Sequence, residues 1–154
     1  MPHATTATGL EGLTSLSGAD LGRTDWQKIT QERVNTFADA TGDHQWIHTD
    51  PEKAKDGPFG GPIAHGYLTL SLIIPLFGEL LDITGISMSV NYGLDKVRFP
   101  SPVPVGARIR LHGAVGTVEE AQGNGVQMPL TFTVEVEGSD KPACVAQAVY
   151  HHYA

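Results

Sequence analysis

The stretch "LTLSLIIPLFGELL", residues 68–81, decides the fold of this chain, because it is its longest apolar segment. Its length and its internal polar and proline residues exclude a membrane span, so we interpret it as a buried core helix. Pro75 predicts either a kink or a helix that stops near Ile74 and restarts. The interrupting residues are Thr69, Ser71, Pro75 and Glu79.

The chain that follows this segment has the pattern of β-strands. Alternating apolar residues begin near Val90, and three longer runs follow at 107–120, 126–138 and 143–154. Their period-two stretches and short spacers containing Gly, Asn or Asp are typical of consecutive strands in one antiparallel sheet. A sheet with one very apolar helix available to cover it predicts an α+β fold.

The chain before the apolar segment reads as a tail followed by helices. Residues 1–9 are small and polar, so we expect a flexible tail, with 10–154 forming a single domain. Thr30 has the position of a helix N-cap and Gly42 that of a helix stop. Asp50, followed by a proline, starts a second helix. Residues between Gly42 and Asp50 therefore form a connection between two helical pieces.

Composition excludes several classes of function. The net charge of −7 argues against nucleic acid as the main partner, because phosphate binding needs a basic face. Cys144 is the single cysteine, so neither an intrachain disulfide nor a four-cysteine metal site is possible. The N-terminus lacks the pattern of a signal peptide, and we expect a cytoplasmic protein. No dinucleotide or nucleotide-triphosphate motif is present, so we expect no cofactor.

The connection after Gly42 carries unusual chemistry for a turn, because Asp43 and His48 lie only five residues apart in it. A carboxylate and an imidazole that face one point can hold a water, remove its proton and return one. Two plainer interpretations remain open: Asp43 as a local cap, and His48 as a buried, satisfied histidine. A metal site of His44, His48 and His65 is a third, which the expected loop conformation disfavours.

A second candidate site is "IAHGYLTLSL", residues 63–72, at the start of the apolar helix. Gly66 at this position leaves free backbone N–H groups that can bind the oxygen of a polarised carbonyl. Ser71 follows one and a half turns later. Its plainer interpretation is a core serine that bonds back to the preceding turn.

Together, "TGDHQWIHTDPEKA" (41–54), "AHGYLTLSL" (64–72) and "NYGLDKVRFPSPVPVG" (91–106) resemble the MaoC-like dehydratases, the (R)-specific enoyl-CoA hydratases. The resemblance spans about residues 20–152. Gln45 and Trp46 replace the family's usual Asn and Pro, a variant similar to the nodulation protein N subgroup and to a branch of small mycobacterial hydratases. The residues that match the family's motif are Gly42, Asp43, Ile47, His48 and Ala54.

The resemblance implies a hotdog fold, in which a curved antiparallel sheet wraps a long central helix, and a homodimer. It implies that Asp43 and His48 hold the water that adds to a trans-2-enoyl thioester, giving a (3R)-3-hydroxyacyl thioester. The Gly66 N–H would bind the thioester oxygen, and Ser71 would support the carboxylate or water. The expected partner is acyl-CoA or an acyl carrier protein, with no membrane and no metal.

Some roles stay open. Lys96 and Arg98 either meet the phosphates of coenzyme A or form a solvated strand end. Trp46 either lines the acyl site or is a packing residue, and Phe59 and Tyr67 are further candidates to limit acyl length. The competing functions are a hotdog thioesterase and a non-catalytic acyl-thioester-binding subunit.

Overall fold

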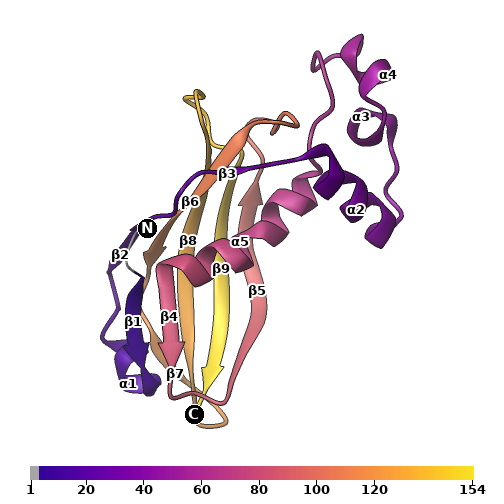
Figure 1. The fold of residues 1–154 in the computed structure, drawn as a ribbon. Coiled ribbons are helices and arrows are strands. Elements are labelled where there is room, and N and C mark those ends of the chain that lie inside the picture. Colours follow the sequence, from indigo (N-terminus) through magenta and orange to yellow (C-terminus); the bar gives the residue numbers. More distant parts are fainter. Residues whose placement is uncertain (1–3) are drawn as a thin grey trace.

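A computed structural model describes residues 4–154 and contains one curved, seven-stranded antiparallel sheet (Figure 1). Its central order is β2-β6-β8-β9-β5, with β3 on β6 and β7 on β8. The consecutive antiparallel strands β6, β8 and β9 confirm the interpretation of the last three runs. The strands are β2 (Asp20–Arg23), β3 (Gln27–Lys28), β5 (Met88–Arg98), β6 (Arg108–Val115), β7 (Glu119–Ala121), β8 (Gly125–Val136) and β9 (Cys144–Tyr153).

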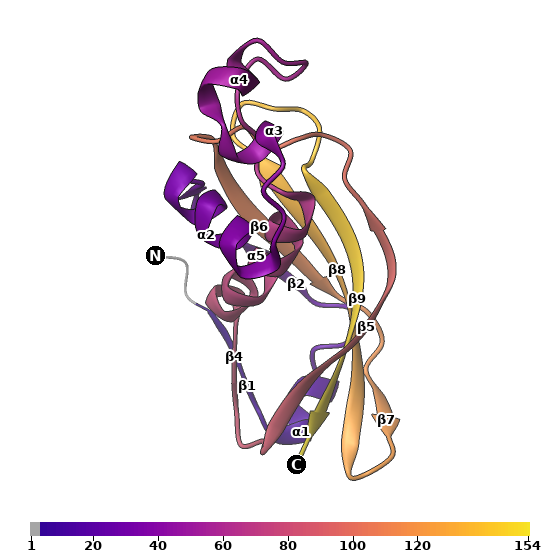
Figure 2. The same ribbon diagram turned by 90° about the vertical axis from the view of Figure 1, so that its right-hand side faces the viewer.

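The apolar segment forms helix α5 (Gly66–Leu80), which lies against one face of the curved sheet (Figure 2). Its buried side includes Leu72, Leu76 and Leu80, which join the core made by β6, β8 and β9. The helix continues through Pro75, so the alternative of a stop near Ile74 was wrong. Pro75 lies on the exposed side, where losing one backbone hydrogen bond does not interrupt the buried contacts.

The prediction of a flexible N-terminal tail was wrong for residues Thr5–Thr8, which form strand β1. This strand pairs in parallel with β4 (Leu81–Thr84), which directly follows α5, and Ala7 is 2% exposed. The physical reason is that threonine suits a strand and that the exposed edge of β4 supplies a partner. Helix α1 (Gly9–Thr14) follows, and residues 1–3 of the expected tail lie outside the described residues.

Helices α2 (Gln31–Thr41), α3 (Trp46–Thr49) and α4 (Pro51–Lys55) gather beyond one end of the sheet, near the start of α5 (Figure 1). The sequence signals for both ends of α2 and for the start of α4 were correct. The Thr30 side chain accepts a hydrogen bond from the Arg33 N–H, and Gly42 ends α2 in the left-handed conformation, with φ 81°. Asp50 caps α4 in the same way as Thr30 caps α2. The loop conformation expected between Gly42 and Asp50 was wrong for residues 46–49, which form the one-turn helix α3 and carry the buried His48, because backbone bonds such as Asp50 N–H to Trp46 close the turn locally.

Within residues 4–154, no helix is long and apolar enough to cross a membrane.

Candidate active site

His48 lies on α3 with its ring buried, and its Nδ1 atom is 2.7 Å from the backbone oxygen of Ile63. A carbonyl oxygen only accepts hydrogen bonds, so Nδ1 carries the proton and donates it. In the neutral ring Nε2 then holds the free lone pair. The contact with the chain just before α5 therefore leaves the Nε2 lone pair of His48 able to accept a proton.

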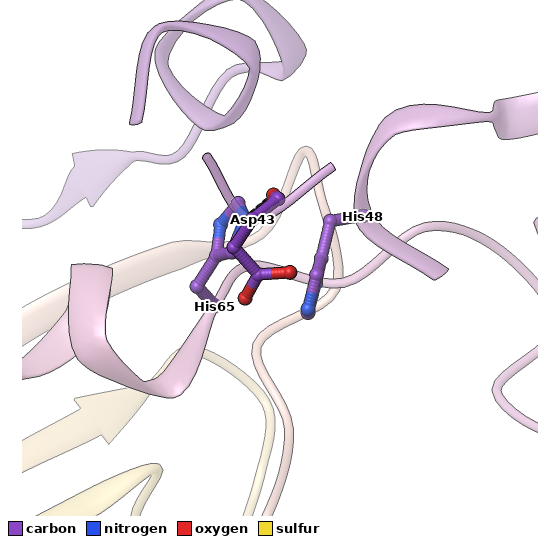
Figure 3. Close-up of side chains that lie close together, drawn as sticks. All are labelled: Asp43, His48 and His65. Carbon is purple, nitrogen blue, oxygen red and sulfur yellow. Dashed lines mark hydrogen bonds between the residues drawn. The ribbon is translucent and has the colours of Figure 1, made fainter. Parts of the chain in front are cut away.

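Asp43, His48 and His65 converge, and one ligand atom from each lies within 4.8 Å of the others (Figure 3). Asp43 is exposed, whereas both histidines are buried. One Asp43 carboxylate oxygen accepts a long hydrogen bond, 3.4 Å, from the Gln45 N–H. Asp43 thus makes the local turn contact that the plain interpretation predicted, and it also faces His48. The pair expected from the sequence is brought together.

His65 is the member of the cluster that sequence reasoning placed only as a possible metal ligand. Its Nε2 lies 3.0 Å from the backbone oxygen of Asp43, and its ring stacks on His48 with centroids 4.0 Å apart. Phe37 of α2 packs on the same ring at 4.8 Å. The signal available in the sequence was its place immediately before Gly66, at the start of a buried helix.

The geometry of the cluster does not suit a metal ion. The two histidine rings are stacked at an interplanar angle of 25°, so their in-plane lone pairs lie in nearly parallel planes, and one nitrogen of each ring already binds a backbone oxygen. A tetrahedral zinc site requires nitrogen atoms about 2.0–2.1 Å from one ion, with lone pairs that converge on it. His44, the other histidine considered, is exposed and lies 3.8 Å from Asp39 instead.

A pocket of about 310 Å³ opens between His48 and the first turn of α5. Gly66 lines it and is the first residue of that helix, where backbone N–H groups have no partner within the helix. A Cβ atom added at Gly66 would lie 3.4 Å from the ring of Phe99, which is an ordinary van der Waals distance. The other residues that line it are Phe59, Ile63, Ala64, Thr69, Phe99, Ser101, Pro102, Val103 and Ala143.

Thr69 and Phe99 were not singled out from the sequence, because each has the ordinary pattern of its helix or strand end. Cys144 lies next to this pocket in sequence, but it is buried and burial raises the pKa of its thiol to about 11. A thiol with so high a pKa is not a nucleophile at neutral pH. Among the residues that line the pocket, His48 carries the one ionisable side chain, and the Asp43 carboxylate lies near it in the cluster.

Ser71 is not brought to this pocket. Its hydroxyl donates to the backbone oxygen of Tyr67 at 2.7 Å, which is the back-bond of the plain interpretation. It lines a separate cavity of about 230 Å³ with Asn91 and Leu94. Within this single chain, a direct contact from Ser71 to Asp43 is therefore not part of the site.

The residues proposed to limit acyl length separate in the structure. Phe59 lines the pocket beside His48, whereas Tyr67 is 73% exposed and is not among the residues that line it. Trp46 packs closely against Gly57, and the Lys53 ammonium lies 4.8 Å from the Trp46 ring centroid. Trp46 thus has the contacts of a packing residue that joins α3 to the chain around α4.

The profile of the family described as "MaoC like domain" matches residues 14–137, most of the chain. The chain belongs to the MaoC-like dehydratase family. A relative from Mycobacterium tuberculosis, named 3-hydroxyacyl-thioester dehydratase Z, is 52% identical over 92% of this chain and 94% of its own length. Nodulation protein N of Rhizobium leguminosarum bv. viciae is 44% identical over 89% of this chain and 86% of its own.

Solved structures of MaoC-like proteins share the fold. The "monoamine oxidase regulatory protein" of Archaeoglobus fulgius has a TM-score of 0.78, 23% identity and 99% coverage of both chains. The "(R)-hydratase from A. caviae involved in PHA biosynthesis" has a TM-score of 0.69 and 26% identity, covering 87% of this chain and 94% of its own. These comparisons confirm the expected family, the hotdog fold and the assignment to the hydro-lyases.

Proposed function

We propose that this MaoC-like dehydratase is an (R)-specific enoyl-CoA hydratase of fatty acid metabolism. It would add water reversibly to a trans-2-enoyl-CoA and give a (3R)-3-hydroxyacyl-CoA. The observation that carries the proposal is the convergence of the Asp43 carboxylate with a His48 ring whose Nε2 lone pair is free. The names of the M. tuberculosis relative and of the A. caviae (R)-hydratase support the substrate class and the stereochemistry.

The proposed mechanism places one water between Asp43 and His48. His48 Nε2 removes a proton from the water while its oxygen bonds to C3 of the enoyl group, and Asp43 orients the water by accepting its second hydrogen bond. Electrons of the C2–C3 double bond move toward the thioester oxygen, and the Gly66 N–H stabilises the enolate charge. The pair then returns a proton to C2, so water is added across one face and both side chains recover their starting states.

The residues that line the pocket favour an apolar acyl chain over a polar one. Phe59, Phe99, Pro102 and Val103 give it apolar surface beside the reactive pair. Lys96 and Arg98 are exposed near the end of β5, and we assign them to the phosphates of coenzyme A. Loading the same enoyl group on an acyl carrier protein distinguishes the two carriers.

We also propose a homodimer that forms through β5 and α5. β5 is the edge strand of the central sheet order, and unpaired strand edges readily add another strand. Large apolar side chains of β5, including Val90 and Leu94, are exposed, as is Ile74 of α5. A second copy of the chain would cover this apolar surface and continue the sheet. The free, buried Cys144 agrees with a reducing compartment, and we propose a cytoplasmic location.

The test is hydration of crotonyl-CoA by the purified protein. The reaction is measured as the loss of the absorbance of the conjugated enoyl group. Oxidation of the product by an (R)-specific 3-hydroxyacyl-CoA dehydrogenase assigns its stereochemistry. We expect loss of absorbance and the (R)-product. Release of free thiol without hydration would identify a thioesterase. Binding of crotonyl-CoA with neither reaction, repeated with longer enoyl chains, would identify a binding subunit.

A further inference from the structure

His65 is a buried histidine that the hydration mechanism does not use. It precedes α5 as the N-cap residue, is 2% exposed, and its ring contacts the rings of Phe37 and His48. Its Nδ1 atom is buried and has no hydrogen-bond partner among the described residues. A buried nitrogen without a partner is costly, so its retention in the core calls for an explanation.

The other ring nitrogen supplies that explanation. Nε2 lies 3.0 Å from the backbone oxygen of Asp43, so it carries the proton and donates it. The other hydrogen bonds of Asp43 are weaker: its N–H reaches Thr41 Oγ1 at 3.4 Å, and its carboxylate reaches the Gln45 N–H at 3.4 Å. The bond from His65 is therefore the shortest that holds this exposed residue in place.

The ring of His65 also restrains His48. The two rings stack with centroids 4.0 Å apart, and the Nδ1 bond to the Ile63 backbone oxygen also anchors His48. His65 consequently contacts both groups of the reactive pair, one by a hydrogen bond to the backbone and the other by packing. The distance between the Asp43 carboxylate and the His48 imidazole depends on this common neighbour.

We propose that His65 is a positioning residue, which sets the placement of Asp43 against His48 through its Nε2–H bond and its stacked ring. The inference rests on the proposed hydratase function. His65 does not touch the substrate and transfers no proton. Misplacement of reacting groups by about 1 Å costs on the order of a hundredfold in rate, so loss of the bond should appear in kcat.

Two substitutions separate positioning from packing. His65→Met fills similar space, removes the Nε2–H donor and also removes the unpartnered Nδ1. His65→Gln keeps an N–H donor near the position of Nε2. His44→Met is the matched control, because His44 directly follows Asp43 in the chain but is exposed and lies outside the cluster.

With crotonyl-CoA, we expect kcat of His65→Met to fall about tenfold to a hundredfold with a smaller change in KM. We expect His65→Gln to recover most of that loss and His44→Met to match the wild type. The melting temperature of His65→Met should stay near that of the wild type, because the lost bond and the removed orphan nitrogen offset each other. An unchanged kcat in His65→Met, or an equal loss in His65→Gln, would overturn the proposal.

Nitrogen-15 NMR of the uniformly labelled protein, which reports the backbone amides and the histidine rings, tests the geometry without any turnover. In the wild type we expect His65 protonated at Nε2 and His48 at Nδ1. His65→Met should shift the Asp43 amide and the His48 ring signals, whereas His44→Met should leave the His48 ring unchanged. If these shifts occur in a protein that does not hydrate enoyl-CoA, the proposed function fails and the positioning stands. If Asp43 and His48 do not respond, the positioning fails whatever the activity.

Discussion

Asp43→Asn should separate activity from stability, because the Asp43 side chain is exposed and its hydrogen bond to the Gln45 N–H is long, at 3.4 Å. Exposed substitutions of this kind change the free energy of unfolding by about 0.5 kcal/mol or less. In a domain of this size that is a change in melting temperature of about 2 °C at most. The fold should therefore survive the substitution almost unchanged.

The effect on rate should be far larger. Proton transfer and water orientation by a placed side chain contribute about 10²–10⁴-fold, and an amide neither carries the charge nor accepts as strongly as a carboxylate. The corresponding loss of transition-state stabilisation is about 2.7–5.4 kcal/mol, at 1.36 kcal/mol for each factor of ten. The kinetic loss thus exceeds the folding loss at least about fivefold.

The assay combines crotonyl-CoA hydration with thermal unfolding of the same preparations. Asp39→Asn is the matched control, since Asp39 is exposed on the neighbouring helix, loses the same charge and lies outside the cluster. We expect the control to keep wild-type kcat. Hydration by Asp43→Asn within a factor of about ten of the wild type would refute the role of this carboxylate, and so would an equal loss in Asp39→Asn.

Three further predictions concern the oxygen site, the dimer and the pH dependence of stability. Gly66→Pro removes one backbone N–H at the first position of α5, a position where proline fits a helix. We expect it to lower kcat about 10²–10³-fold. Gly66→Ala keeps the N–H and should lower kcat much less in the same assay. Leu94→Glu places a charge on the exposed apolar face of β5 and should convert a dimer to a monomer by light scattering; a dimer that persists would show that β5 is not the interface. Partial burial tends to raise the pKa of Glu135, but hydrogen bonds from Arg110 and Arg23 outweigh it and hold this pKa below its ordinary 4.5. The ionised Glu135 therefore stabilises the fold above pH 4.5, and this contribution is lost as the pH falls through the lowered folded pKa. The difference in melting temperature between the wild type and Glu135→Gln should shrink over that pH range. A difference that stays constant would contradict the assignment.

The local features of the fold were readable from the sequence because they depend on residues close together in the chain. Periodicity identified the buried helix at 68–81 and the strands after it, since side chains three, four or two residues apart share a face. Thr30, Gly42 and Asp50 marked helix ends, because caps act within one turn. The crowding of Asp43 and His48 in one connection also pointed to their chemistry.

The tertiary structure decided what depends on residues far apart in the chain. The pairing of β5 with β9 and of β1 with β4 joins segments whose own patterns do not name a partner, which is why the N-terminal strand was missed. His65 reaches Asp43 across 22 residues, and Ile63 selects the protonated nitrogen of His48. The Ser71 hydroxyl, which we had expected at the site, donates a hydrogen bond to the Tyr67 backbone oxygen of its own helix. Sequence alone thus indicated most of the elements and the candidate pair, whereas packing between distant segments determined how the pair is held, because only the folded chain sets those distances.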